Sequence, residues 1–180
     1  MITGVTLHRV KKDGNCIFRA VSELLYGSRS EHSMVRNKVV NAMERWKHIL
    51  QPWAKLDDDG WKKRVECMRE DKSWGGTLEL ISVSLAFQVG IRQQWCNEGE
   101  LVLELDTNRT EFGEGLNLVH MHNHYNCVSR TESRPVKGAG LLPLSSIEQW
   151  IKSKTAEYDF DPMKQNESPM ISQQVGCNLI

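Results

Sequence analysis

Near its amino-terminal end the 180-residue chain reads Asp13-Gly14-Asn15-Cys16-Ile17-Phe18-Arg19-Ala20-Val21. Apolar residues recur at helical spacing from Ile17 to Leu25, and Gly27 follows as a stop signal. A glycine-containing turn therefore delivers Cys16 to the first turn of a predicted amphipathic helix. The unpaired N–H groups and the dipole at that position favour a negative sulfur, and thiol pKa values in such settings fall to roughly 3.5–7.5.

Cys16 allows two interpretations from its position alone. Free cysteine is among the most buried residue types, so Cys16 could simply pack at the start of the helix. It could instead be a nucleophile, because the free N–H groups at a helix start can accept the oxyanion of a tetrahedral intermediate. The nucleophilic role requires a partner that takes the thiol proton.

A candidate partner stands among His120, His122 and His124, which alternate along the sequence. In a strand-like conformation residues 124 and 126 point the same way, so the Asn126 side chain can lie beside the His124 ring. The amide oxygen of Asn126 could accept the Nδ1–H of His124 and leave Nε2 free for the thiol. Cys16, His124 and Asn126 would then be nucleophile, base and orienting residue.

The same histidines allow other interpretations. Alternate residues of a strand share a face, so His120, His122 and His124 could bind a metal ion from one side. Nothing nearby offers the further Cys, Asp or Glu that would complete an obvious zinc site. A surface histidine next to a turn asparagine, with no catalytic role, is a third interpretation of His124 and Asn126.

Three blocks of the sequence resemble, in the same order, motifs of the ovarian-tumour (OTU) family of cysteine proteases. Residues 13–21 resemble the nucleophile motif of that family. A second block resembles one that opens a helix, and it reads Trp74-Gly75-Gly76-Thr77-Leu78-Glu79-Leu80. Residues 124–128 resemble the block that contains the catalytic histidine. The resemblance covers about residues 5–130.

This resemblance implies roles for individual residues. Cys16 would be the nucleophile and His124 the general base, with Asn126 orienting the imidazole. Asp13 would shape the loop before the nucleophile, whose backbone amides would form the oxyanion hole. Trp74 would pack near the catalytic cleft, where it could contact substrate or support the histidine strand, unless it is a plain core aromatic.

The resemblance also implies a reaction, which is thiol-dependent hydrolysis of the (iso)peptide bond after the C-terminal glycine of ubiquitin or a ubiquitin-like modifier. No cofactor and no metal are expected, and the expected partner of the monomer is ubiquitin or polyubiquitin. One alternative is a catalytically inactive ubiquitin-binding module of the same fold, against which the joint presence of Asp13, Cys16, His124 and Asn126 argues. Another alternative is a metallohydrolase that uses the alternating histidines.

The remaining sequence predicts helices first and strands second. Residues 123–126 are expected to be a loop or the end of a strand. This order of elements predicts an α+β domain with a small, mostly antiparallel β-sheet flanked by helices. The resemblance implies a papain-like OTU fold. The domain is expected to span residues 1–160, and the polar residues 161–180 to form a tail or linker. Helices are expected near residues 16–25, 35–50, 61–68, 77–89 and 146–154, and strands near residues 5–10, 91–96, 101–105 and 116–122.

The composition restricts the partners and the compartment. Lys and Arg number 23 and so do Asp and Glu, so no net charge directs the chain to nucleic acid or to an anionic membrane. No stretch approaches the ~20 apolar residues of a membrane span. The five cysteines include no CxxC pair, which argues against a disulfide framework and a zinc cage. The sequence therefore predicts free thiols and a cytoplasmic location, or the host-cell cytosol for a viral or bacterial protein.

Overall fold

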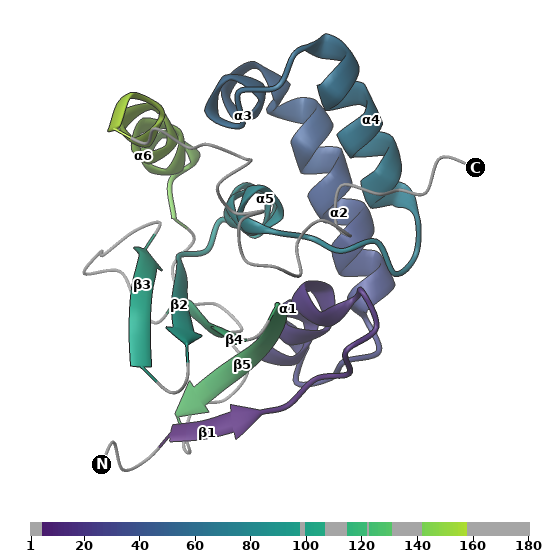
Figure 1. Cartoon of the computed structure of the whole chain (residues 1–180), viewed down its shortest axis with the longest axis vertical. Coiled ribbons are helices and arrows are strands. Elements are labelled where there is room, and N and C mark those ends of the chain that lie inside the picture. The colour runs from purple at the N-terminus through teal and green to yellow at the C-terminus, as the bar shows by residue number, and fades with distance from the viewer. Residues whose placement is uncertain (1–4, 98–99, 107–114, 122, 131–141, 158–180) are drawn as a thin grey trace.

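The computed structural model of the chain describes residues 5–97, 100–106, 115–121, 123–130 and 142–157. In chain order its elements are β1 (Val5–His8), α1 (Cys16–Tyr26), α2 (His32–Arg45), α3 (Lys47–Trp53), α4 (Asp58–Arg69), α5 (Thr77–Phe87), β2 (Ile91–Asn97), β3 (Glu100–Asp106), β4 (Leu116–Met121), β5 (His124–Arg130) and α6 (Leu144–Glu157). Helices α1 to α5 precede strands β2 to β5 (Figure 1), so the predicted α+β class is confirmed.

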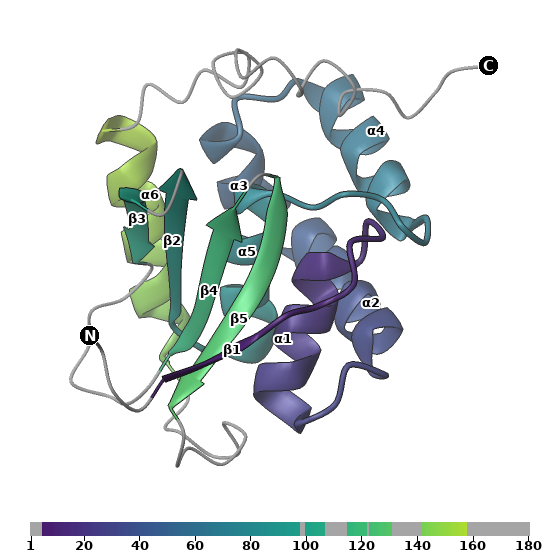
Figure 2. The same cartoon turned by 60° about the horizontal axis from the view of Figure 1, so that its bottom comes forward.

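The described strands form one sheet in the order β1-β5-β4-β2-β3. β2 pairs in parallel with β4, whereas the other neighbours pair antiparallel, so the sheet is mixed and mostly antiparallel. Figure 2 shows the strands side by side in front of α5, with β1 next to β5 and close to α1. The pairing of β1 with β5 brings the loop that follows β1 to the start of β5.

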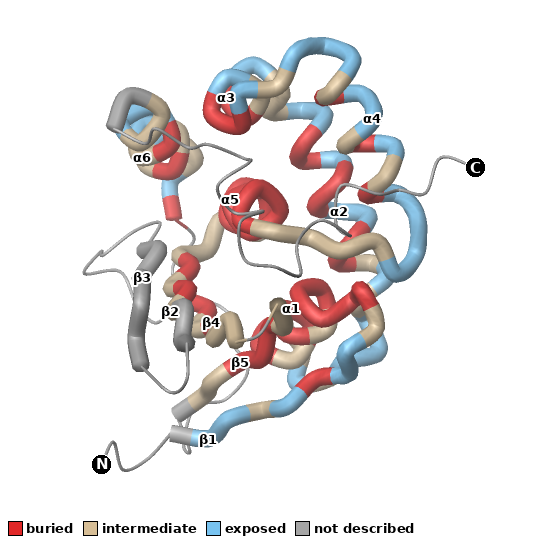
Figure 3. Tube along the Cα trace, viewed as in Figure 1, coloured by how far each residue is buried: buried red, intermediate tan, exposed pale blue. Residues whose placement is uncertain are grey.

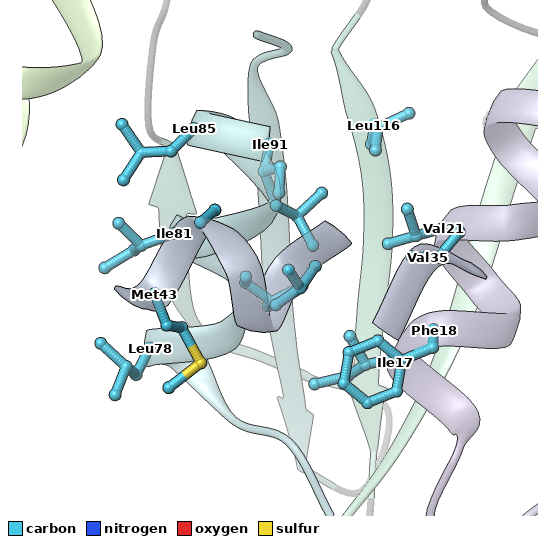
Figure 4. Close-up of a cluster of buried hydrophobic side chains, with 14 of the residues drawn as sticks. Ile17, Phe18, Val21, Val35, Met43, Leu78, Ile81, Leu85, Ile91 and Leu116 are labelled. Atoms are coloured by element: carbon cyan, nitrogen blue, oxygen red, sulfur yellow. The ribbon is translucent and has the colours of Figure 1, made fainter. Parts of the chain in front are cut away.

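Helix α5 lies at the centre of the core, where it contacts α2, α6 and β2. Its residues from Thr77 to Leu85 are all buried, because its sequence is predominantly apolar on every side. Figure 3 shows this burial along the α5 tube, and Figure 4 shows Ile81 and Leu85 near Met43 of α2 and Ile91 of β2. The core thereby joins the helical layer to one face of the sheet.

The helix boundaries follow the sequence prediction with one notable difference. α2 ends at Arg45 and α3 begins at Lys47, so the apolar helical face expected to continue to residue 50 is interrupted at Trp46. The acidic start of α4 agrees with the prediction, since Asp57 caps this helix by accepting a hydrogen bond from the Gly60 N–H at 2.7 Å.

Residues 123–126 are expected to be a loop or the end of a strand, and the structure places Asn123 in a turn and His124 at the start of β5. In the hairpin of β4 and β5, Met121 pairs with His124. Asn123 lies in the turn with a φ of 57°, a left-handed conformation that asparagine adopts readily. His124, Tyr125 and Asn126 are therefore strand residues in a fixed register.

Two further expectations concern the cysteines and the end of the chain. Cys16 and Cys127 are free, as predicted. The expected tail, residues 161–180, lies outside the described residues, as does His122. Within the described ranges, no helix combines the length and the apolar character that crossing a bilayer requires.

Candidate active site

The loop before α1 is organised around the carboxylate of Asp13. Its Oδ1 accepts a hydrogen bond from the backbone N–H of Asn15 at 3.1 Å, which closes a tight turn of the kind that aspartate favours. The guanidinium of Arg19 binds both carboxylate oxygens, with Nη2 2.8 Å from Oδ2. Partial burial acts to raise the pKa of Asp13, but the hydrogen bonds and the charge of Arg19 hold it below its ordinary value. Asp13 is therefore an anion that fixes the turn before Cys16.

Gly14 and Asn15 hold this loop against the segment that follows α4. Gly14 has a φ of 77°, and a Cβ at this position would lie 1.7 Å from the carbonyl oxygen of Lys72. The buried Asn15 side chain donates from Nδ2 to Oδ1 of Asp71 at 3.0 Å and accepts from the N–H of Lys72 at 3.3 Å. Only glycine fits the first of these positions, because the neighbouring group is backbone and cannot move away.

Cys16 is the first residue of α1, and the residue is only 2% exposed. The first helical hydrogen bond runs from the Arg19 N–H to the Asn15 carbonyl at 2.8 Å, so the Cys16 N–H lies at the open end of the helix. The backbone N–H groups of Tyr125 and Ile17 lie close enough to the sulfur to favour the thiolate. The sulfur is therefore placed where α1 meets the start of β5.

Burial nevertheless raises the pKa of the Cys16 thiol above its ordinary value, and the charge of Asp13 acts in the same direction. This corrects the expectation that the helix start would lower the pKa. The reason is that protein rather than water surrounds the sulfur, and loss of hydration disfavours the charged form. In the free protein the group is a thiol at neutral pH.

The start of β5 is tied to the loop through the backbone of Val10. Nε2 of His124 lies 3.0 Å from the Val10 carbonyl oxygen, and the Val10 N–H donates to Oδ1 of Asn126 at 3.2 Å. The Asn126 side chain also lies close enough to His124 to favour its protonated ring. The structure therefore places Asn126 beside His124, as predicted, and adds Val10 as the group that both side chains bind.

The nitrogen of His124 that makes this contact differs from the predicted one. A carbonyl oxygen can only accept, so Nε2 carries the proton and Nδ1 holds the lone pair. Nδ1 is buried and has no hydrogen-bond partner in the described part of the chain. Burial holds the pKa of His124 below its ordinary value, although Val10 and Asn126 offset part of this shift. His124 thus presents a neutral ring with a basic Nδ1, whereas the sequence predicts Nε2 for that role.

A comparison with protein families identifies the chain that carries this arrangement. A model of the OTU-like cysteine proteases matches residues 11–126, which is more than half of the 180-residue chain. The chain belongs to this family. The matched range includes the Asp13 turn, Cys16, His124 and Asn126, so the OTU domain contains every member of the predicted site.

Two relatives of this OTU domain come from Arabidopsis thaliana. The ovarian tumor domain-containing deubiquitinating enzyme 7 is 32% identical over 88 residues, which are 49% of this chain and 23% of that protein. The deubiquitinating enzyme 6 of the same series is 25% identical over 139 residues, which are 77% of this chain and 26% of that protein. The chain therefore spans about a quarter of the length of these relatives.

Solved OTU structures share the fold. The viral OTU domain protease from Dera Ghazi Khan virus superposes with a TM-score of 0.62 at 26% identity, covering 71% of this chain and 81% of that one. An ovarian tumor domain solved in complex with ubiquitin superposes with a TM-score of 0.55 at 20% identity, covering 87% and 90%. At 20% identity the second likeness concerns the fold alone.

In this OTU domain the alternating histidines do not share one strand face. His120 belongs to β4 and pairs with Tyr125 of β5, on whose ring it stacks with the centroids 4.3 Å apart. His124 precedes Tyr125 along β5 and so projects to the other side of the sheet. Among the described residues, no group of three His, Cys, Asp or Glu side chains is placed to hold a metal ion. The shared face assumed for His120 and His124 is therefore wrong, because a hairpin turn separates them.

Trp74 lies in the segment before α5, half-buried against the core of the OTU domain. Its neighbour Gly75 lies next to Ile17, since a Cβ on Gly75 would be 3.2 Å from the Ile17 Cδ1. Trp74 therefore directly precedes Gly75 in the sequence, and Gly75 lies beside Ile17, the residue that follows Cys16. Its contact with substrate or with the histidine strand stays a prediction.

Sequence reasoning missed two residues of this OTU site, Val10 and Arg36. Val10 acts through its backbone, so its side chain gives no signal. Arg36 is 3% exposed and binds the loop before Cys16. A signal for it was present, because Val40 and Met43 stand four and seven residues later and place Arg36 on the apolar face of α2.

Proposed function

We propose that this OTU domain is a deubiquitinase with Cys16 as nucleophile and His124 as general base. The observation that carries the proposal has two parts. The buried Cys16 sulfur lies against the backbone N–H of Tyr125, the residue that follows His124 in β5, and Nδ1 of His124 has no hydrogen-bond partner among the described residues. The substrate would be ubiquitin, polyubiquitin or a ubiquitin-like modifier, cleaved by a monomer in the cytoplasm. The names of the Arabidopsis relatives and the ubiquitin complex of a similar fold support this choice.

Each residue of the site would have a defined part in the reaction. Nδ1 of His124 takes the Cys16 proton while the sulfur attacks the carbonyl carbon of the C-terminal glycine. The Cys16 N–H, at the open end of α1, would stabilise the oxyanion that forms. Collapse of the tetrahedral intermediate breaks the C–N bond, and the leaving amine takes the proton from the imidazolium. A water molecule, deprotonated by His124, then hydrolyses the thioester to a glycine carboxylate and restores the thiol.

The charge state of the free site shapes the first of these steps. Burial raises the pKa of Cys16 and lowers that of His124, so both groups are neutral before substrate binds. A preformed thiolate–imidazolium pair is therefore not the resting state we propose. Proton transfer to Nδ1 would accompany the attack, as in general-base catalysis. The N–H groups of Tyr125 and Ile17 would stabilise negative sulfur as it develops.

The alternative function is a ubiquitin-binding module that has the OTU fold without turnover. Both functions require the same binding surface, so binding of ubiquitin does not separate them. The contacts around Cys16 favour the enzyme, because Asp13, Arg19 and Asn15 fix the turn that presents the sulfur. A binding module has no physical need for that turn.

A ubiquitin that carries a C-terminal electrophile tests the proposal directly. We expect a covalent adduct on Cys16, located by mass spectrometry, and no adduct in the Cys16→Ala variant. Cys127→Ala is the matched control, since Cys127 is also a free buried cysteine whose pKa burial raises to about 12. Labelling at Cys127 in preference to Cys16 would overturn the assignment of the nucleophile. Labelling of Cys16 without cleavage of diubiquitin would favour the binding module.

A further inference from the structure

Arg36 of α2 joins two segments that are far apart in the sequence. Its Nη2 donates to Oδ1 of Asn15 at 2.5 Å, to the Gly14 carbonyl at 3.3 Å and to the Ser73 carbonyl at 2.9 Å. Its Nη1 donates to the Met68 carbonyl at 3.2 Å. One guanidinium therefore binds the loop before the nucleophile, the last turn of α4 and the segment that follows α4.

The contact with Gly14 fixes a particular peptide unit. In a trans peptide the C=O and the following N–H point in opposite directions. The Gly14 carbonyl points to Arg36, while the Asn15 N–H points to Oδ1 of Asp13 at 3.1 Å. Arg36 and Asp13 thus hold the two ends of the Gly14–Asn15 peptide unit. This unit comes one before the peptide that carries the Cys16 N–H, so its orientation sets the direction in which the chain enters α1.

The same guanidinium provides a positive charge beside the loop that precedes the nucleophile. Its Cζ lies 4.0 Å from the centroid of the Phe18 ring, which covers one face of it. Burial lowers the pKa of Arg36 to about 10, and nearby acidic groups that include Cys16 act in the opposite direction. Arg36 is therefore charged at neutral pH, and Cys16 has the smallest effect among the groups that raise its pKa, after Asp71, Glu79 and Asp13.

We propose that Arg36 is a positioning residue of the nucleophile in the deubiquitinase reaction proposed above. It holds the Gly14–Asn15 peptide so that the Cys16 N–H points to the forming oxyanion, and its charge stabilises the sulfur as it becomes negative. Lysine cannot replace it fully, because a single ammonium cannot bind acceptors on both segments in the geometry of the planar guanidinium.

A purely structural role is the competing explanation, because a buried arginine with these contacts also stabilises the fold. The two explanations differ in the properties of the molecules that remain folded. If Arg36 only stabilises the fold, folded molecules of a variant have a wild-type nucleophile. If Arg36 positions the Cys16 loop and contributes a positive charge to it, the folded molecules of a variant have a nucleophile with altered reactivity.

The experiment compares Arg36→Met, Arg36→Lys and a matched control, Val39→Ala. Val39 is buried on the same helix and contacts the core, so its truncation lowers stability without reaching the loop. For each variant, the rate of Cys16 alkylation by iodoacetamide is followed by mass spectrometry against pH. Values of kcat and KM on a ubiquitin substrate are normalised to the folded fraction.

In Arg36→Met we expect the midpoint of the alkylation profile to move to higher pH, because a positive charge near the sulfur is lost. We also expect kcat to fall about 10²-fold with little change in KM, since a small misplacement of a reacting group has an effect of this size. Arg36→Lys should return the profile toward the wild-type midpoint while kcat stays reduced. In Val39→Ala the profile and kcat should equal those of the wild type at a lower Tm.

Wild-type profiles and kcat in both Arg36 variants would overturn the proposal, whatever their Tm. If Arg36→Met does not fold, Arg36→Lys decides, because a normal kcat in that variant contradicts the positioning role. The alkylation measurement needs no ubiquitin. It therefore still tests Arg36 if the wild-type protein fails to cleave ubiquitin, an outcome that would contradict the proposed function instead.

Discussion

The two halves of the site are held in different ways. On the nucleophile side, Asp13 and Asn15 are bound by side chains from three directions, namely Arg19, Arg36 and Asp71. On the base side, the described hydrogen bonds of His124 and Asn126 both go to the backbone of one residue, Val10. Several side chains therefore hold the loop of the proposed nucleophile, whereas the side chains of the proposed base and of Asn126 depend on the position of the Val10 backbone beside β5.

This difference has a consequence for mutational effects. A change in the nucleophile loop disturbs several buried polar groups at once, so its effect should reach the stability of the fold. A change at His124 or Asn126 removes a contact to one backbone segment and should act mainly on turnover. Each of the following predictions tests one side of this comparison.

Gly14→Ala should have the largest effect. The new Cβ would lie 1.7 Å from the Lys72 carbonyl, at a φ of 77° that alanine disfavours. We expect a loss of at least about 3 kcal/mol in the free energy of unfolding, measured in urea, and loss of activity with it. Gly75→Ala is the matched control, because the nearest neighbours of its Cβ would be side-chain atoms of Ile17 at 3.2 Å and of Glu79 at 3.4 Å, and not backbone. Equal stability losses in the two variants would show that the loop is not rigidly held.

His124→Ala should have the second-largest effect, which should be on turnover and not on the stability of the fold. Removing a general base lowers kcat/KM by about 10²–10⁴-fold. The Tm should change little, since His124 is only half-buried and gives up one hydrogen bond. Cleavage of a ubiquitin substrate and thermal unfolding, measured on the same preparation, check both parts. More than a tenth of wild-type kcat/KM in the variant would remove His124 from its assigned role.

Asn126→Ala should lower kcat/KM by about tenfold, less than His124→Ala does, because it loosens the imidazole without removing the base. It should also cost about 1–3 kcal/mol of stability, since the buried Val10 N–H loses its acceptor. Asn126→Asp keeps an acceptor oxygen and is the control for that stability loss. Unchanged kcat/KM in Asn126→Ala would mean that another group orients His124.

The pH dependence of Cys16 alkylation should show a smaller effect. Burial and the charge of Asp13 both raise the pKa of Cys16, so the rate should keep rising with pH beyond the midpoint of free cysteine. Asp13→Asn removes that charge and should move the midpoint to lower pH. A wild-type midpoint below that of free cysteine would mean that the position at the helix start, and not burial, determines the pKa of the Cys16 thiol.

The smallest effects are expected for metal removal and for His120→Ala. His120 stacks on Tyr125 and faces away from the side on which His124 lies, so its loss should leave most of the turnover. Incubation with a chelator should leave cleavage unchanged, whereas thiol alkylation should abolish it. Stoichiometric zinc in the purified protein, together with chelator-sensitive cleavage, would contradict the cysteine-protease mechanism.

Local sequence patterns sufficed to predict the loop and helix start around Cys16, but not the strand that carries His124 and Asn126. The turn before Cys16 and the start of α1 depend on neighbouring residues, so the sequence predicts them. The strand character of His124 to Asn126 depends on pairing with β4 and on the loop after β1, and their polar side chains resemble a loop. The raised pKa of Cys16 could not be predicted from the sequence either, because the burial that causes it comes from the packing of α1 against β5.

The bond between Val10 and Asn126 spans 116 residues of sequence. Contacts of such large separation form late in folding, because the entropy of closing the loop must be overcome first. During synthesis the ribosome releases Cys16 long before His124 exists, and domains fold as units once their chain is available. The Cys16 thiol is therefore synthesised long before the residue that we propose as its base. In the proposed mechanism, proteolytic activity would therefore begin only after the chain has brought Val10 and Asn126 together.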